Sequence, residues 1–294
     1  MPGDTTKTID RYELRNRYLF TGRLEMQTAL HIGGGRITLS SSDSPVVLTP
    51  DEKPFIPGSS FKGALRSTIE KLVPNLPGLR TCGLSTKENE NDPLREGKAD
   101  WCPTAHQAAL VRRRRNLSEQ DAEKQLETER LNLCHTCQLF GSQYAAAHVN
   151  INDLYVVEEA WSGIIQIRDG VAIDRDSEKA KDRLKYDFEV VPAQAVFDLS
   201  ITLENATPQD LQLICVGLSE FVHSFGAIGG KRSRGLGACR LNDLKVSSLE
   251  LEGEGVGVNE RNQRLKNFLL KREFPVIEDG SVFLDRYIQR IFDQ

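Results

Sequence analysis

The chain has 294 residues, of which 39% are hydrophobic and 27% are charged, and its formal net charge is −4. This length allows one sizeable core with insertions, or two small domains. The negative charge argues against a protein that coats nucleic acid without discrimination, so any contact with nucleic acid must come from local basic patches. No apolar run reaches the roughly 20 residues of a membrane span, and the start Met1-Pro-Gly-Asp lacks a signal-peptide core. We therefore expect a soluble, cytoplasmic protein with no membrane partner.

Residue periodicity predicts a core with the element order strand, helix, strand, strand, helix, strand. In chain order these elements span residues 17–32, 60–73, 149–157, 193–204, 207–226 and 236–247. Thr207-Pro208 with Asp210 has the form of a capped helix start. The order is that of a split βαβ fold, so the expected fold class is α+β with a ferredoxin-like (RRM-like) core.

Two insertions interrupt this core, which we assign to a single domain over residues 1–250. The first insertion, residues 74–147, is polar and begins with Pro and Gly punctuation. The second, residues 162–188, has mixed charge and an Asp169-Gly170 pair typical of a turn, which predicts a protruding β-hairpin. Residues 251–294 follow a Glu/Gly-rich linker and are expected to form a C-terminal helical extension.

The first insertion contains four cysteines that predict a structural zinc site. They are Cys82, Cys102 and the Cys-x-x-Cys pair Cys134 and Cys137. Four thiols supply the four ligands of one tetrahedral zinc ion, and a polar insertion with little apolar content needs such a cross-link to fold stably. Three other interpretations remain open: free thiols at chance positions, a redox Cys-x-x-Cys, or His106 or His135 in place of one cysteine. The spacing to Cys82 and Cys102 is irregular, so the sequence supports Cys134 and Cys137 best.

The start of the helix predicted over residues 60–73 is a candidate phosphate site. Ser59 or Ser60 can cap the helix, and Lys62 and Arg66 lie four residues apart along it. A helix N-terminus that carries two cations attracts phosphate. The alternative is an ordinary capped helix with solvated Lys and Arg side chains.

A second candidate is the glycine-rich segment Gly229-Gly-Lys-Arg-Ser-Arg-Gly-Leu-Gly237. Glycines allow close approach of the backbone to a ligand, and Lys231, Arg232 and Arg234 supply positive charge. The segment is not a nucleotide P-loop, because Phe225 and Arg232 occupy positions where that motif needs Gly and Ser or Thr. It predicts phosphate binding, with a basic surface turn as the alternative.

Short motifs occur in a defined order along residues 17–248. They are Leu30-His-Ile-Gly-Gly, Asp43-Ser-Pro-Val, Ile56-Pro-Gly-Ser-Ser-Phe-Lys-Gly, Leu139-Phe-Gly141, Val171-Ala-Ile-Asp-Arg175 with Phe188-Glu-Val-Val-Pro192, and the loop 229–237. Together, and in this order, they resemble the RAMP-type backbone subunits of type III CRISPR effector complexes. One such match would be weak, but the ordered set is specific.

The resemblance implies roles for two further residues and for the hairpin. Asp43 matches the position of the family's catalytic aspartate, although without the resemblance an Asp before Ser-Pro is a turn former. Such a carboxylate can hold Mg²⁺ or Mn²⁺ near the scissile phosphate, or orient attack by the RNA 2′-hydroxyl. His31 matches a position that contacts guide RNA. The hairpin corresponds to a thumb that wedges between paired guide and target bases.

The implied function is that of a guide-RNA-binding backbone subunit and metal-dependent endoribonuclease that cuts complementary target RNA. Its partners would be guide RNA, target RNA, other subunits of the CRISPR complex, and copies or paralogues of itself in a head-to-tail array. Two alternatives remain open: a non-catalytic guide-RNA scaffold, or a stand-alone guide-processing RAMP ribonuclease that relies on a histidine rather than Asp43.

Overall fold

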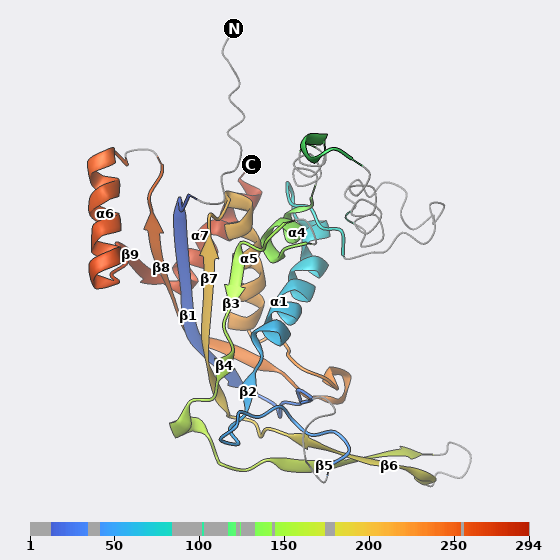
Figure 1. Cartoon of the computed structure of the whole chain (residues 1–294). Helices are drawn as coiled ribbons and strands as arrows, with labels where there is room; N and C mark the ends of the chain where they lie inside the picture. The colour runs from blue at the N-terminus through green and yellow to red at the C-terminus, as the bar shows by residue number, and fades with distance from the viewer. Residues whose placement is uncertain are drawn as a thin grey trace.

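The computed structural model describes residues 13–34, 42–83, 102, 117–121, 124, 133–142, 145–173, 180–253 and 256–293. Most of the insertion predicted over residues 74–147, including His106, lies outside these residues. Within them the protein is α+β, with a five-stranded antiparallel sheet in the order β3-β7-β1-β8-β9. Helices α1, α5 and α7 cover one face of that sheet (Figure 1). No helix in this described part of the chain is long and apolar enough to cross a membrane.

The strands are β1 Asn16–Met26, β2 Phe55–Ile56, β3 Val149–Ile151, β4 Leu154–Tyr155, β5 Gln166–Ile173, β6 Ala180–Val190, β7 Val196–Glu204, β8 Cys239–Glu250 and β9 Val276–Asp279. The helices are α1 Gly58–Leu72, α4 His135–Phe140, α5 Pro208–Val222, α6 Val258–Lys271 and α7 Gly280–Phe292, with short 3₁₀ turns η1 Val73–Asn75, η3 Glu158–Ala160 and η4 Arg232–Arg234. Strands β2 and β4 form a separate two-stranded sheet, as do β5 and β6.

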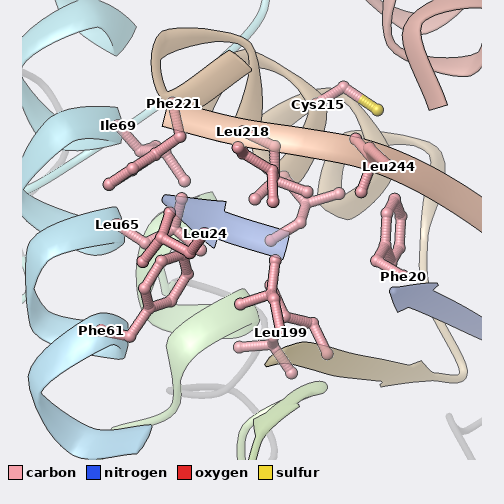
Figure 2. Packing of buried hydrophobic residues seen from close by; sticks show 14 of the residues in the cluster. Phe20, Leu24, Phe61, Leu65, Ile69, Leu199, Cys215, Leu218, Phe221 and Leu244 are labelled. Carbon is pink, nitrogen blue, oxygen red and sulfur yellow. The ribbon is translucent and has the colours of Figure 1, made fainter. Parts of the chain in front are cut away.

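The main core lies between the sheet and the helices that cover it, and Figure 2 shows part of its packing. Buried side chains of this core come from β1, α1, β7 and α5, among them Phe20, Leu24, Phe61, Leu65, Ile69, Phe197, Leu199, Leu218 and Phe221. Gly217 allows α5 to approach α1 closely, because a Cβ there would lie 2.7 Å from side-chain atoms of Leu65 and Ile69. The two helices therefore form one layer.

The start of α1 differs from the prediction. The helix begins at Gly58 with Pro57 at the N-cap position and no side-chain cap, so capping by Ser59 or Ser60 was wrong. Instead, the Gly58 amide donates to Oδ1 of Asp153 at 2.7 Å. A carboxylate from a distant segment thus occupies the anion position at this helix end.

The same contact explains why one predicted strand is two. The strand expected over residues 149–157 divides into β3 and β4, with Asn152 and Asp153 between them. A Cβ on Gly58 would lie 2.4 Å from the Ile151 carbonyl oxygen, so the helix start packs directly on this break. Because Asp153 must point at α1, the residues around it leave the regular strand.

Helix α5 begins where the sequence predicts. The Thr207 side chain accepts from the Asp210 amide and the Asp210 carboxylate accepts from the Thr207 amide, so the two residues form a capping box, with Pro208 as the first residue of the helix. The helix ends at Val222, four residues before the predicted end at Gly226.

The C-terminal residues contain a strand that the sequence did not predict. Strand β9 pairs with β8 and becomes an edge of the main sheet. Helix α7 packs into the main core through Phe283, Leu284, Tyr287 and Ile291. Residues 276–292 are therefore part of the same packed unit as the sheet.

Candidate nucleic-acid interface and cysteine cluster

Strand β6 lies between the loop that carries Asp43 and the basic loop 229–237 and contacts both. Side chains alternate between the two sides of a strand, and those at the end of β6 divide accordingly. Asp187 and Glu189 make hydrogen bonds to residues 42–46, whereas Tyr186 and Phe188 contact the cations of the basic loop. Figure 1 shows β5 and β6 projecting together from one end of the main sheet.

Asp43 is exposed and is held by reciprocal hydrogen bonds to Asp187. The Asp43 amide donates to Asp187 Oδ1 at 2.7 Å, and the Asp187 amide donates to Asp43 Oδ2 at 3.1 Å. The Ser42 hydroxyl donates to the same Asp187 Oδ1 at 2.9 Å. The carboxylate of Asp43 is thus both open to solvent and fixed relative to β6.

The predicted turn at Asp169-Gly170 was wrong, since both residues lie inside β5. Asp169 pairs with Asp187, and Gly170 pairs with Tyr186. A Cβ on Gly170 would lie 2.3 Å from the Tyr186 ring, so the aromatic ring covers the glycine. Gly170 therefore serves the packing of Tyr186 rather than a change of chain direction.

His31 is buried, with 6% of its surface exposed. Nδ1 lies 2.7 Å from the Glu189 carbonyl oxygen and donates to it, which leaves Nε2 to accept from the Ser44 hydroxyl at 3.3 Å. Burial lowers the pKa of His31; the hydrogen bond to Glu189 opposes this shift and the charge of Lys231 adds to it. A neutral imidazole in this position links β6 to the Asp43 loop, and its contact with guide RNA stays a prediction.

The basic loop is built on His31 and on the aromatic side chains of β6. The Gly230 amide donates to the His31 carbonyl oxygen at 2.9 Å. Gly229, at φ +84°, approaches the same oxygen so closely that a Cβ would lie 2.4 Å from it. This position requires glycine both for its backbone angle and for lack of space.

The cations of this loop are placed differently. Lys231 Nζ lies 4.2 Å from the ring centroid of Phe188, and Arg234 Nη1 donates to the Tyr186 hydroxyl. Arg232 and Arg234 are exposed. The structure thereby brings Asp43, His31, Lys231 and Arg234 into contact with β6, and Arg232 lies between the two cations in the same loop.

Lys62 and Arg66, the two candidate cations of α1, make their contacts away from β6 and the basic loop. Arg66 Nε pairs with Glu70 Oε1 at 2.7 Å, its Nη2 donates to Cys137 Sγ at 3.3 Å, and its side chain is 14% exposed. Lys62 Nζ lies 3.5 Å from the Val149 carbonyl oxygen, and burial lowers its pKa, with a further contribution from Arg66. Arg66 is therefore engaged with the cysteine cluster, and an RNA contact by either residue remains a prediction.

The four cysteines of the insertion converge. The Sγ atoms of Cys82, Cys102, Cys134 and Cys137 all lie within 4.8 Å of one another, and all four residues are buried. In a tetrahedral zinc site with Zn–S bonds of about 2.3 Å, the sulfur atoms lie about 3.8 Å apart. The 3.6 Å separation of Cys82 Sγ and Cys137 Sγ fits that geometry. This donor set can hold a metal such as zinc.

Hydrogen-bond donors around the four cysteines favour their deprotonated, thiolate form over the thiol. The Cys134 amide donates to Cys102 Sγ at 3.1 Å, and the Arg66 guanidinium donates to Cys137 Sγ. His135 accepts from the Arg80 amide through Nδ1 and is not a member of the metal-binding group found among the described residues. The sulfur cluster therefore needs no ligand from His135.

Comparison with known proteins assigns the family. The family model described as RAMP superfamily matches residues 23–240. The chain belongs to the RAMP superfamily. Relatives of this RAMP protein include proteins named CRISPR system Cms endoribonuclease Csm3. The one from Streptococcus thermophilus is 24% identical over 236 residues, which cover 78% of this chain and 89% of the relative.

Other relatives match over shorter segments. The Csm3 protein of Enterococcus italicus is 47% identical over 60 residues, or 19% of this chain and 28% of the relative. The Csm3 protein of Methanothermobacter thermautotrophicus is 41% identical over 59 residues, or 19% of this chain and 24% of the relative. In these two alignments the RAMP protein spans about a quarter of the relatives' length.

Sequence reasoning missed three residues of this interface. Tyr186 and Phe188 support the cations, and Asp187 holds the Asp43 loop. The alternating order Tyr-Asp-Phe-Glu is the signal that could have revealed a strand with an aromatic and an acidic side. Its partners lie far away in sequence, so the pattern alone did not identify what each side contacts.

Proposed function

We propose that this RAMP protein is a guide-RNA-binding backbone subunit of a type III CRISPR ribonucleoprotein and cuts complementary target RNA with Asp43 as the catalytic residue. The observation that carries the proposal is the exposed Asp43 carboxylate, fixed to the same strand that supports the cations of loop 229–237. The names of the relatives, which include endoribonuclease, are consistent with this activity. The cytoplasm is the expected location.

RNA binding would rest mainly on the basic loop. Lys231, Arg232 and Arg234 would contact phosphates, with His31 holding the loop and contacting the guide, and Lys62 and Arg66 as further RNA-binding candidates. Such contacts are independent of base identity, so specificity would come from pairing between guide and target. The β5–β6 pair would act as the thumb that separates guide and target bases.

The chemistry proposed for the Asp43 site is attack of the adjacent 2′-hydroxyl on the scissile phosphorus: the 2′-oxygen gives up its proton and forms a 2′,3′-cyclic phosphate, while the P–O5′ bond breaks and the 5′-oxygen of the next nucleotide leaves and takes up a proton. That reaction needs in-line geometry and neutralisation of phosphate charge more than it needs a protein nucleophile. Asp43 would orient the 2′-hydroxyl or hold Mg²⁺ or Mn²⁺, and an exposed carboxylate suits hydrated cations of this type. Bound there, the cation would neutralise charge on the scissile phosphate.

The remaining assignments follow from the arrangement of the chain. The order β1, α1, β3, β7, α5, β8 supports a ferredoxin-like core, here proposed for residues 1–250 with the insertions at 74–147 and 162–188. The four-cysteine cluster would hold a structural Zn²⁺ that organises the first insertion. Partners would include target RNA, other complex subunits, and copies or paralogues in a head-to-tail array.

Two alternatives make different demands. A histidine-dependent, guide-processing ribonuclease needs an imidazole that can exchange protons with its substrate, whereas His31 is buried and both ring nitrogens have partners. A non-catalytic scaffold does not require an exposed, positioned Asp43. The geometry therefore favours the catalytic subunit over both alternatives.

The test uses the ribonucleoprotein purified with its guide and a guide-complementary RNA. Asp43→Ala should abolish cutting while guide and target binding stay near wild type. The matched control is Asp198→Ala, which removes an exposed carboxylate of β7. In the part of the chain that the structure describes, its ion pair is a long surface contact, with 4.0 Å between Arg23 Nε and Asp198 Oδ1. Equal cutting by the Asp43→Ala complex would refute the catalytic assignment and leave the scaffold role.

A further inference from the structure

The hydrogen bonds around Asp43 point beyond the catalytic aspartate to its neighbour on β6. One oxygen of Asp187, Oδ1, accepts both the Asp43 amide at 2.7 Å and the Ser42 hydroxyl at 2.9 Å. The Asp187 amide in turn donates to Asp43 Oδ2 at 3.1 Å. Two residues separated by 144 positions in the chain are thus joined through both backbone and side chain.

We propose that Asp187 is a positioning residue for cleavage: its side-chain oxygen holds the Asp43 backbone amide and the Ser42 hydroxyl, and so fixes the place from which the Asp43 carboxylate meets the RNA. This inference rests on the proposed catalytic role of Asp43. Asp187 acts as a hydrogen-bond acceptor, and the group that meets the RNA is Asp43. Asp43 is exposed, and among the residues that the structure describes its hydrogen bonds are those to Asp187.

The structure separates this role from the general stability of the strand. β6 is also anchored by the Glu189 carboxylate, which accepts from the Val46 amide at 3.0 Å, and by the Glu189 amide, which donates to the Ser44 carbonyl. These bonds and the buried Phe188 and Val190 hold the strand without Asp187. Loss of the Asp187 side-chain acceptor should therefore release the Asp43 amide and the Ser42 hydroxyl from β6 and displace the loop that carries the Asp43 carboxylate, while the strand stays in place.

The experiment compares Asp187→Ala and Asp187→Asn in the purified, guide-loaded complex, under single and multiple turnover. A lost hydrogen bond to a charged acceptor predicts that Asp187→Ala lowers kcat by about 10- to 100-fold. KM for target RNA should stay unchanged, because Asp187 does not bind the substrate. Asp187→Asn should keep most activity, since the amide oxygen can accept the same two hydrogen bonds.

Two further complexes make the outcomes distinguishable. Asp169→Asn removes the same charge from the residue that pairs with Asp187 across the hairpin, and should cut normally. Asp43→Ala is tested in parallel.

Each outcome decides a specific point. Wild-type cutting by Asp187→Ala beside an inactive Asp43→Ala would overturn the positioning role and leave Asp43 catalytic. An Asp187→Asn complex as slow as Asp187→Ala, or an equally slow Asp169→Asn, would show that negative charge and not the acceptor matters. Normal cutting by Asp43→Ala would overturn the proposed function and this inference with it. If Asp187→Ala lowers the Tm of the protein, the Asn variant and its kcat carry the test.

Discussion

Removing two cations from the basic loop should change the salt dependence of RNA binding by a calculable amount. Arg232 and Arg234 are both exposed, whereas Lys231 is held over Phe188. Each phosphate contact to a single strand contributes about −0.7 to the slope of log K against log salt. The double variant Arg232→Ala/Arg234→Ala should therefore have a slope shallower by about 1.4. Over a fourfold rise in salt, wild type should lose about sevenfold more affinity than the variant.

The assay is fluorescence anisotropy with labelled guide RNA, and with a second RNA of scrambled sequence, at several salt concentrations. Because phosphate contacts carry no sequence information, both RNAs should lose affinity to the same extent. Lys245→Ala/Lys271→Ala is the matched control, since it removes two exposed cations from β8 and α6 and should leave the slope near wild type. A double variant of the loop with an unchanged slope would mean that the loop is only a basic surface turn.

Three other results are expected. Elemental analysis should find about one zinc per chain. The Cys134→Ser variant should lose this zinc and the Cys239→Ala variant should keep it. Wild-type protein that is well folded without metal would contradict the role of the four cysteines as a structural zinc site. Gly58→Ala should lower the free energy of unfolding in urea by about 1–3 kcal/mol, because its Cβ would lie 2.4 Å from the Ile151 carbonyl oxygen. The control Gly63→Ala should be neutral or stabilising, since a Cβ there would lie within 4 Å of no atom in the described residues beyond its own stretch of helix. Equal effects of the two substitutions would exclude the clash at Gly58. A target with one deoxyribose at a cleavage site should bind but resist cutting there, and efficient cutting at that position would point to an activated water instead.

Local patterns in the sequence predicted most of the core elements. Alternation along β1 and β7 and the capping box of α5 involve residues within a few positions of one another, so they can be read from the chain alone. The break between β3 and β4 could not, because its cause is the bond between Asp153 and Gly58, 95 positions apart. The missed strand β9 has the same origin, since it exists through pairing with β8.

The candidate site was predictable to a similar extent. Lys231, Arg232 and Arg234 are neighbours in sequence, and their charge was evident there. The environment of Arg66 was not, because the Cys137 thiol that it contacts lies 71 positions away. Asp187 was missed for the same reason: its partner is Asp43, and nothing in the local sequence connects the two.

Because the side chains of β6 alternate between two sides with different partners, a shift of the strand by an odd number of residues differs from a shift by an even number. Asp187 and Glu189 contact one loop while Tyr186 and Phe188 contact the other, so a deletion of one residue would present an aromatic ring where a carboxylate now accepts the Asp43 amide. A change of two residues would preserve both sides. Variation in the length of this strand should consequently be tolerated in even steps, and a single-residue change would disturb the acidic and the cationic loops together.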